Sequence, residues 1–443
     1  MKRIIFGFAG LTVAAWLFGL WANPPAWNGR ALSHEVFYLN GVLAFGLMAI
    51  AVIIAARPAW IERVAGEPLD ELYRSHRTIG FWAIGLSVFH IFTKDVMAPV
   101  FSLLTLEPAT KPVPAEPVTW LDAFWQQLRP FAVTSSWVVS AAGLILAVLI
   151  FVPQVRYALW AKLHALFSVI FIVLAVHAVR LMDAADLTLP LGWINLAVTI
   201  VGTWYSVKLL AVGPGRSKTF AASVDAVEKH PGATIVVVKP AAADAPRFKG
   251  GQFAFLRAKG AEKHPFSVTQ QLPDGRIIFS IKSFSGWTKS GAPNLKAGDP
   301  VEVEGPWGAF CPDFNAREQV WVAAGIGIAP FCAWMATAAE RRRAQGGQAS
   351  DEPRIQLNWC IKSRDAEPLL ERAVSLAKAA GIELRIFESK GERLDPKRLF
   401  EKGVPERLAL CAGGRLAGSV CDAFAQAGGT PEMIQREYFV WRR

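Results

Sequence analysis

Four histidines lie inside apolar stretches of this chain, where an unsatisfied imidazole would be costly. They are His76 and His90, fourteen residues apart, and His164 and His177, thirteen residues apart. A polar side chain in a membrane helix is expensive unless another group satisfies its nitrogens. Hydrogen bonding between helices, proton transfer and metal binding are the three kinds of chemistry that this residue type offers here.

Six apolar runs in the first half of the chain must position these histidines. Each run is close to the roughly 20 residues that a helix needs to cross a bilayer. The histidines lie on the third and fifth runs, which are parallel because one helix separates them. His76 can then face His164 at one depth, and His90 can face His177 at another. The six runs are 4–22, 36–56, 78–98, 133–152, 158–180 and 190–211.

Two histidines on facing helices at one depth form a bis-imidazole clamp for haem iron. Two such levels would lie about 20 Å apart at 1.5 Å per residue. Fourteen residues return to within about 40° of the same helix face at 100° per residue, whereas thirteen do not. The interval in the fifth helix therefore requires a local irregularity or different rotamers. His34 has no such partner, so we expect a structural or interfacial role for it.

The two halves of the chain differ in composition. The whole chain is 53% hydrophobic and carries a net charge of +11, but residues 1–212 hold few charges and residues 213–443 have mixed polarity. A basic cytoplasmic face near anionic membrane lipid accounts for this charge, so no nucleic acid is expected as a partner. All five cysteines lie in the second half without CxxC spacing, so we expect reduced thiols rather than disulfides or a zinc site.

Charged residues in the connections predict the orientation of the helices. Four arginines lie in the second connection, whereas the third and fifth connections carry more acid. The positive-inside rule therefore predicts a multi-pass protein of the inner (plasma) membrane with both termini cytoplasmic. The first segment is similar to a signal peptide, but an uncleaved helix is favoured because no small-x-small site precedes its Pro pair. The four arginines are Arg57, Arg63, Arg74 and Arg77.

The second half of the chain contains two further patterns. Short β-rich runs recur between 217 and about 312 with Gly, Pro and Asp-Gly breaks, which predicts a small antiparallel barrel. The runs are "ATIVVVKP", "GQFAFLRA", "RIIFSIKSF" and "DPVEVEGP". From about 318, strands alternate with helices and end in "YFVWR", which predicts a parallel α/β sheet. We therefore expect a six-helix transmembrane bundle over 1–212, an antiparallel β-barrel over 213–316 and a parallel-sheet domain over 317–443.

Two kinds of motif in this half could bind nucleotides. In "VAAGIGIAP" a strand runs into a glycine turn and a helix, and Gly325 and Gly327 would let the backbone approach a pyrophosphate. "HPFSVT" (264–269) and "IKSFSGWT" (281–288) lie on adjacent barrel strands. There Ser267 is suited to hydrogen-bond a flavin ring nitrogen and Phe266 to lie along the ring. The pyrophosphate would be met by Lys282, Gly286 and Thr288.

The order of these parts resembles the NADPH oxidase and ferric reductase superfamily over nearly the whole chain. The resemblance implies a di-haem membrane domain, a FAD barrel and an NADPH-binding domain. The histidine intervals of fourteen and thirteen, "YRSHRTIG", "EGPWG" and "GIGIAPF" match the family's motifs. It implies two haems b, an inner one held by His76 and His164 and an outer one held by His90 and His177.

The resemblance also implies roles for single residues of the second half. "LCAGGRLAGSV" is similar to a Cys-Gly-Pro segment of the family, with Cys411 retained and Ala412 and Gly413 in place of Gly-Pro. Ser267 and Cys411 are the expected catalytic residues. Trp441 or Phe439 would be the aromatic residue that stacks on flavin. The remaining expected cofactor-binding residues are His264, Pro265, Trp287, Ile326 and Pro330.

Basic residues after the second and third strands of the sheet favour NADPH over NADH, because a 2′-phosphate is anionic. The basic residues are Lys362 and Arg364 after the second strand and Lys390, preceded by Ser389, after the third. The resemblance implies electron flow from NADPH through FAD and both haems to an extracytoplasmic small molecule. Oxygen is slightly favoured over a ferric chelate. Delivery to a periplasmic partner protein and a proton-coupled transporter are the alternatives, and the oligomeric state is left open.

Overall fold

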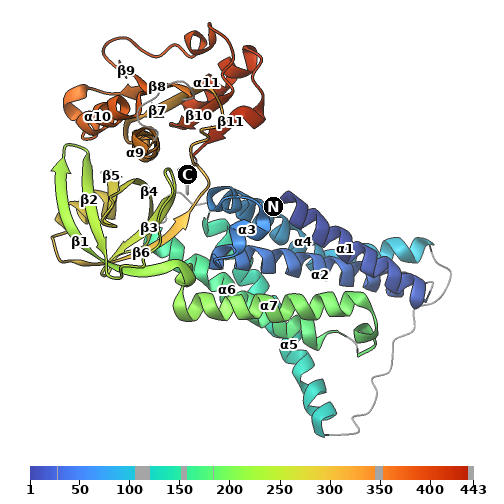
Figure 1. Cartoon of the computed structure of the whole chain (residues 1–443). Helices are drawn as coiled ribbons and strands as arrows, with labels where there is room; N and C mark the ends of the chain where they lie inside the picture. Colours follow the sequence, from blue (N-terminus) through green and yellow to red (C-terminus); the bar gives the residue numbers. More distant parts are fainter. Residues whose placement is uncertain (27, 105–119, 151–156, 183, 345–352, 438–443) are drawn as a thin grey trace. The chain divides into compact units, whose positions relative to one another are not determined.

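The computed structural model describes residues 1–26, 28–104, 120–150, 157–182, 184–344 and 353–437. The chain divides into two compact units, one formed by residues 1–67 and 71–217 and the other by residues 68–70 and 218–442. Long helices make up the first unit, and a β-barrel followed by an α/β sheet makes up the second (Figure 1).

Over the residues that the structure describes, each of the six predicted apolar runs lies within a long helix, so the helical prediction is confirmed. Three of the helices begin well before the apolar run does, because helical structure continues into the more polar flanking sequence. A short helix, α3 (Ile61–Ala65), follows the second long helix of the chain. The long helices are α1 (Lys2–Ala22), α2 (Gly29–Ala56), α4 (Leu69–Leu104), α5 (Trp120–Ile150), α6 (Tyr157–Arg180) and α7 (Pro190–Val212).

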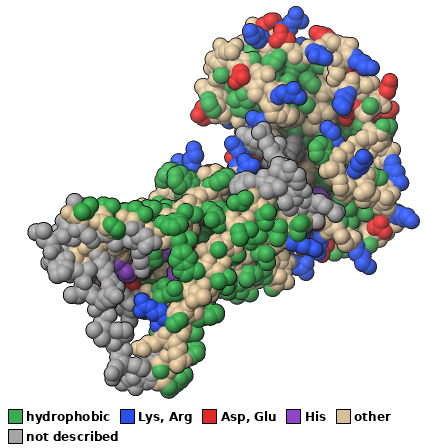
Figure 2. Space-filling model, turned by 180° about the vertical axis from the view of Figure 1, so that it is seen from behind, with side chains coloured by type: hydrophobic (Ala, Val, Ile, Leu, Met, Phe, Trp, Pro, Cys, Tyr) green, Lys and Arg blue, Asp and Glu red, His purple; other side chains and the backbone are tan. Residues whose placement is uncertain are grey.

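The outer surface of the helical unit is apolar. Figure 2 shows hydrophobic side chains covering it, whereas charged side chains gather on the other unit. Large apolar side chains such as Phe6 and Trp21 are more than two thirds exposed, which is typical of a surface that contacts lipid. All of these long helices except α4 are apolar and long enough to cross a membrane by length and composition.

Helix α7 packs against α2 and α6. Phe45 of α2 and Phe171 of α6 stack with ring centres 4.4 Å apart and planes 10° from parallel. A Cβ atom at Gly202 of α7 would lie 2.2 Å from the Phe171 ring. Glycine at this position therefore makes room for the ring, which is fully buried.

The barrel of the second unit closes in the order β1-β2-β5-β4-β3-β6 with antiparallel pairing throughout. This confirms the predicted barrel, although the sequence pattern missed β1, whose residues mix Asp, Glu, Lys and His with small apolar side chains. The strands are β1 (Thr219–His230), β2 (Ala233–Pro240), β3 (Phe253–Ala258), β4 (His264–Gln271), β5 (Ile277–Lys282) and β6 (Pro300–Trp307).

The remaining five strands form a parallel sheet in the order β11-β10-β7-β8-β9, which confirms the predicted α/β domain. Three fully buried tryptophans, Trp321, Trp334 and Trp359, fill the core between the sheet and its helices. The predicted strand "YFVWR" and the stacking candidates Phe439 and Trp441 lie outside the described residues. The elements are β7 (Glu318–Ala324), α9 (Ala329–Ala344), β8 (Arg354–Ile361), α10 (Leu370–Ala380), β9 (Glu383–Glu388), β10 (Arg407–Cys411), α11 (Gly414–Gln426) and β11 (Ile434–Arg436).

Candidate functional site

The four membrane histidines come together in two pairs, each with one member on α4 and one on α6. The ring centres of His76 and His164 lie 5.8 Å apart, and their planes cross at 69°. The ring centres of His90 and His177 lie 6.5 Å apart, and their planes cross at 83°. All four side chains are only half-buried. The predicted pairing by depth therefore matches the geometry of the helical unit.

These distances fit two imidazoles that share one metal ion. A bond from a metal to an imidazole nitrogen is about 2 Å long, and the ring centre lies about 1 Å behind that nitrogen. Two imidazoles that held one metal ion between them would therefore have ring centres about 6 Å apart. Both pairs come close to that separation, at 5.8 Å and 6.5 Å.

Backbone carbonyls orient three of the four imidazoles. The Nδ1 atom of His76 lies 3.1 Å from the carbonyl oxygen of Ala51, and that of His90 lies 3.1 Å from the carbonyl oxygen of Phe37. His177 makes the same contact with Ala132 of α5 at 3.3 Å. Because a carbonyl can only accept, each Nδ1 carries the hydrogen, and Nε2 is left with the lone pair that binds a metal.

The hydrogen bonds between α4 and α2 explain the fourteen-residue interval. His76 and His90 are fourteen residues apart. Ala51 and Phe37, whose carbonyls accept the hydrogen bonds of these histidines, are fourteen residues apart as well. Asn40 adds a third contact, because its Nδ2 donates to the carbonyl of Leu86 at 3.0 Å. The two helices therefore run antiparallel in one constant register, and the interval between the histidines follows the same interval on α2.

The thirteen-residue interval on α6 is accommodated without a break in the helix, because α6 is continuous from Tyr157 to Arg180. Different neighbours hold its two histidines. His177 donates to α5, whereas the ring of His164 stacks on Trp160 with centres 5.1 Å apart and planes 5° from parallel. Both rings therefore reach α4 through different side-chain directions. This is one of the two solutions that the thirteen-residue interval allowed.

The predicted flavin motifs are neighbours in the barrel. The His264 ring stacks on Trp287 with centres 5.3 Å apart and planes 9° from parallel, and the Phe266 ring lies 6.3 Å from the same indole. Pro265 lies between them on β4 and pairs with Phe255 of β3. Burial lowers the pKa of His264, so its imidazole is held neutral beside this aromatic cluster.

Ser267 has the property expected of a ligand-binding residue. Its hydroxyl is buried and has no hydrogen-bond partner among the described residues. A buried polar group without a partner costs about 1–3 kcal/mol, so such a group calls for an explanation. A bound ring nitrogen would supply the missing partner, and the residue therefore fits the flavin site.

The expected pyrophosphate residues lie at the end of β5 and in the turn that follows. Gly286 has a φ of +53°, a conformation that favours glycine. The Thr288 hydroxyl donates to the Ser285 carbonyl and accepts from the backbone nitrogens of Phe284 and Ser285. Thr288 therefore stabilises the shape of the turn, whereas Lys282 is exposed.

The glycine turn of the sheet meets Cys411 at the point where strand order reverses. β7 lies between β8, which follows it in sequence, and β10, which comes later, so the β7–β10 edge is a topological switch point. Gly327 lies there in the turn formed by Gly325, Ile326 and Gly327, just before Pro330 in α9. A Cβ atom at Gly327 would lie 2.2 Å from the Cys411 carbonyl oxygen. Only glycine permits this approach.

Burial raises the pKa of Cys411 well above its ordinary value, and the negative charge of Glu437 acts in the same direction. The thiol is therefore neutral at physiological pH. Burial also raises the pKa of Cys332, to about 12. Neither sulfur has the thiolate character of a nucleophile, so Cys411 is suited to pack against a ligand rather than to attack it.

Arg364, one of the basic residues expected to contact the 2′-phosphate, has an acidic partner that the sequence did not reveal. The Arg364 Nε atom donates to the Glu388 carboxylate at 2.8 Å, and the Arg364 backbone nitrogen donates to the same carboxylate. Lys362 is exposed. Glu388 is the last residue of β9, so its place at the carboxyl end of the third strand was the available signal.

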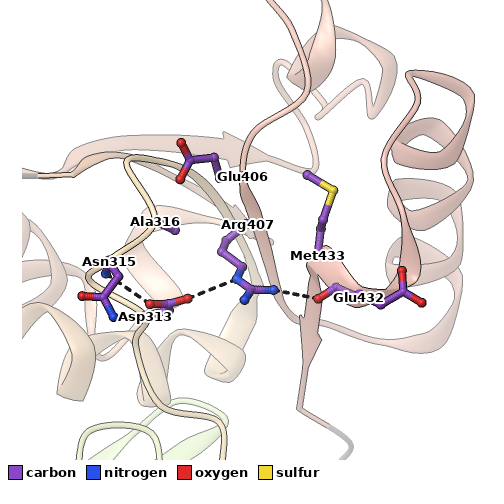
Figure 3. A pocket seen from close by; sticks show the side chains of 7 residues that line it. All are labelled: Asp313, Asn315, Ala316, Glu406, Arg407, Glu432 and Met433. Atoms are coloured by element: carbon purple, nitrogen blue, oxygen red, sulfur yellow. Dashed lines mark hydrogen bonds and ion pairs between the residues drawn. The ribbon is translucent and has the colours of Figure 1, made fainter.

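A pocket of about 460 Å³ lies at the opposite, amino-terminal edge of the sheet. Figure 3 shows Arg407 bridging the Asp313 carboxylate and the Glu432 carbonyl, at 3.1 Å and 2.7 Å. Arg407 is the first residue of β10, whereas Cys411 is its last. The pocket is therefore separate from the glycine turn, and none of the predicted site residues lines it.

Known families and proteins are similar to parts of this chain. The family described as ferric reductase like transmembrane component matches residues 40–175, which include three of the four histidines. Respiratory burst oxidase homolog protein C of Solanum tuberosum is 26% identical over 202 residues, covering 38% of this chain and 21% of that protein. Ferric reduction oxidase 7 of Arabidopsis thaliana is 31% identical over 147 residues, covering 28% and 19%. The matches thus span about a fifth of each relative.

A solved structure is similar to about half of the chain. The flavohem-like FAD/NAD binding domain of nitric oxide dioxygenase from Vibrio cholerae O1 biovar El Tor covers 50% of this chain and 98% of its own. It is 18% identical, and the TM-score is 0.41.

The buried hydroxyl of Ser267 leads to the first prediction. Ser267→Ala should weaken FAD binding about tenfold, because the loss of a hydrogen bond of about 1.4 kcal/mol changes affinity by that factor. Removal of FAD should leave the variant at least as stable as the parent chain, since the variant no longer buries an unpaired hydroxyl. Flavin titration by fluorescence and thermal unfolding measure the two effects.

Ser223→Ala on β1 is the control for this prediction and should leave FAD affinity unchanged. Equal FAD affinity of Ser267→Ala and the parent protein would remove Ser267 from the flavin site.

The packing of α2 on His90 leads to a second prediction. A Cβ atom at Gly41 would lie 2.8 Å from Cε1 of the His90 ring, so Gly41→Ala must displace the imidazole from the Phe37 carbonyl. Disturbing the group that orients a metal ligand costs about 10–100-fold in metal affinity. We therefore expect loss of the metal centre at the His90–His177 level, measured as haem content of the purified protein.

Gly85→Ala on α4 is the matched control, because no atom lies within 4 Å of its Cβ position. Full haem content in Gly41→Ala would show that the imidazole position is not critical.

Proposed function

We propose that this chain, which is similar to the ferric reductase like transmembrane family and to respiratory burst and ferric reduction oxidases, passes electrons from NADPH through FAD and two b-type haems to an acceptor outside the cytoplasm. The observation that carries the proposal is the two facing histidine pairs, with ring centres 5.8 Å and 6.5 Å apart. Three of these imidazoles donate Nδ1–H to a carbonyl and so carry the lone pair on Nε2.

Haem iron supplies reversible one-electron chemistry, and FAD converts a two-electron donor into single electrons. The residues of the chain have to align these groups and keep water away. His76 and His164 would hold the inner haem, and His90 and His177 the outer one. The stacked rings of Phe45 on α2 and Phe171 on α6 are buried in the interior of the helical unit, where they exclude water.

The second unit would bind the flavin and the nicotinamide. Ser267 would hydrogen-bond the flavin ring, with His264, Phe266 and Trp287 as the aromatic cluster beside it. The glycine turn at 325–327 would receive the NADPH pyrophosphate, and the neutral Cys411 thiol would pack near the nicotinamide. No acid–base residue is needed, because hydride transfer depends on alignment of the two rings.

NADPH is the proposed donor because Lys362 and Arg364 follow the second strand of the sheet. The Glu388 carboxylate accepts a hydrogen bond from the Arg364 guanidinium at 2.8 Å, so a 2′-phosphate would compete with this carboxylate for the guanidinium. The exposed Lys362 side chain adds positive charge at the same end of the sheet. NADH is the alternative donor that these charges favour less.

Dioxygen is the proposed acceptor, since the HPFS and GWT motifs resemble those of oxidases. A ferric chelate is the alternative small molecule, and a periplasmic redox protein is the alternative of a different class. Arginines in the second connection support cytoplasmic termini and an inner-membrane location. The acceptor would then meet the outer end of α6, where Arg180 lies over the Trp125 ring at 5.4 Å.

The haem assignment predicts the haem content of single variants. His90→Ala and His164→Ala should each lower haem content from about two per chain to about one, because each level loses one of its two axial ligands. Pyridine haemochrome analysis of the purified protein measures this content. His34→Ala on α2 is the control and should retain both haems. Unchanged haem content in both ligand variants would refute the assignment.

The acceptor assignment predicts the product of turnover. With NADPH and FAD supplied, cytochrome c reduction in air should be mostly sensitive to superoxide dismutase and should exceed ferric-chelate reduction. Faster reduction of ferric chelate under argon would assign the chain as a ferric reductase instead. Negligible turnover with either acceptor, relieved by a periplasmic extract, would point to a partner protein.

A further inference from the structure

One imidazole at each level of the helical unit has an aromatic ring stacked on it. Trp160 lies one helical turn before His164 on α6, and the two rings are 5.1 Å apart and 5° from parallel. Phe37 of α2 lies against His90, with ring centres 3.8 Å apart and planes 23° from parallel. Neither aromatic residue was among the predicted site residues.

These contacts determine the planes of the two imidazoles. The torsion that rotates an imidazole about its bond to Cβ is broad and only weakly restricted on its own. A flat ring packed against one face removes that freedom, because rotation would force the two rings into each other. Phe37 restricts His90 twice, since its ring covers the imidazole and its carbonyl accepts the Nδ1–H.

The opposite imidazole at each level lies in a different plane. His76 crosses His164 at 69°, and His177 crosses His90 at 83°. His76 and His177 are oriented by hydrogen bonds to Ala51 and Ala132 on other helices. At each level, therefore, one imidazole is covered by an aromatic ring and the opposite one is oriented by a carbonyl. The planes of the two imidazoles are close to perpendicular.

We propose that Trp160 and Phe37 are positioning residues that hold the axial imidazoles of the two haems nearly perpendicular to their partners. This inference rests on the proposed haem function. Neither residue touches the iron, and each acts through the histidine that it covers. The same arrangement at both levels would give the inner and outer haems the same kind of ligand field.

The angle between axial imidazoles has a measurable consequence. Each imidazole donates π electrons mainly into one of two iron d orbitals, depending on the direction of its plane. Parallel planes separate the energies of these orbitals, whereas perpendicular planes keep them nearly equal. Ligand orientation is therefore one of the means by which a protein tunes haem iron. In the oxidised low-spin state, near-equal orbital energies give a strongly anisotropic paramagnetic resonance signal with a large maximum g value.

Low-temperature electron paramagnetic resonance of the oxidised full-length protein tests the proposal. Trp160→Ala should keep two haems but lower the maximum g value of the inner haem alone, because His164 is free to turn. Phe37→Leu should do the same for the outer haem alone. Trp160→Phe and Phe37→Tyr keep a flat ring on the imidazole and should restore the parent signals.

Two further sets of variants make the result interpretable. His76→Ala and His90→Ala assign the signals, because each should leave one haem. Trp193→Ala on α7 is a matched control, since this indole is 59% exposed on the outer surface of the helical unit. It should change neither signal. If Trp160→Ala loses haem, Trp160→Leu keeps apolar volume without a flat ring and carries the same test.

The proposed function and the proposed positioning roles are overturned by different results. Retention of both haems in His76→Ala and His90→Ala would overturn the proposed function. Loss of one haem in each of these variants, with unchanged signals in haem-replete Trp160→Leu and Phe37→Leu, would overturn only the positioning roles.

Discussion

The hydrogen bond from a histidine Nδ1–H to the backbone carbonyl of another helix is the interaction on which the helical unit depends. In an apolar surrounding both imidazole nitrogens need a partner, and the carbonyl satisfies one of them while leaving Nε2 for iron. Because His76 and His90 both donate to α2, the same bonds set the register of the two helices. Helices in a membrane gain little from apolar contact alone, so polar contacts of this kind determine how they align.

Close backbone approach has the corresponding role in the second unit. Gly327 lies against the Cys411 carbonyl at the edge between the paired strands β7 and β10, where the strand order reverses. The absence of a side chain at this glycine brings the turn, the following helix and the end of β10 together. A ligand at such an edge meets backbone nitrogens and a helix start rather than a set of charged side chains. The two units thus build their sites from backbone groups, which suits chemistry that depends on alignment.

Some features were predictable because their signals are local. The apolar length of the six helices, the glycine turn and the HPFS motif each occupy one short segment. β1 was missed because its sequence lacks a clear alternation and its strand is defined by pairing with β2 and β6. The partner of Arg364 was missed for a similar reason, since Glu388 is 24 residues away and meets it only across neighbouring strands. The stacking of Phe37 on His90 joins residues 53 positions apart.

By itself, the sequence determined the kinds of element, their order, the depth of each histidine and the chemistry that imidazole offers, because residue type, apolar length and helical rise are properties of single segments. Tertiary structure alone decided which carbonyl each imidazole meets, how a thirteen-residue interval serves two levels and at what angle facing rings cross. These depend on side-chain directions and on contacts between separate helices, as the different neighbours of His164 and His177 illustrate. Such contacts follow from packing, which no single segment encodes.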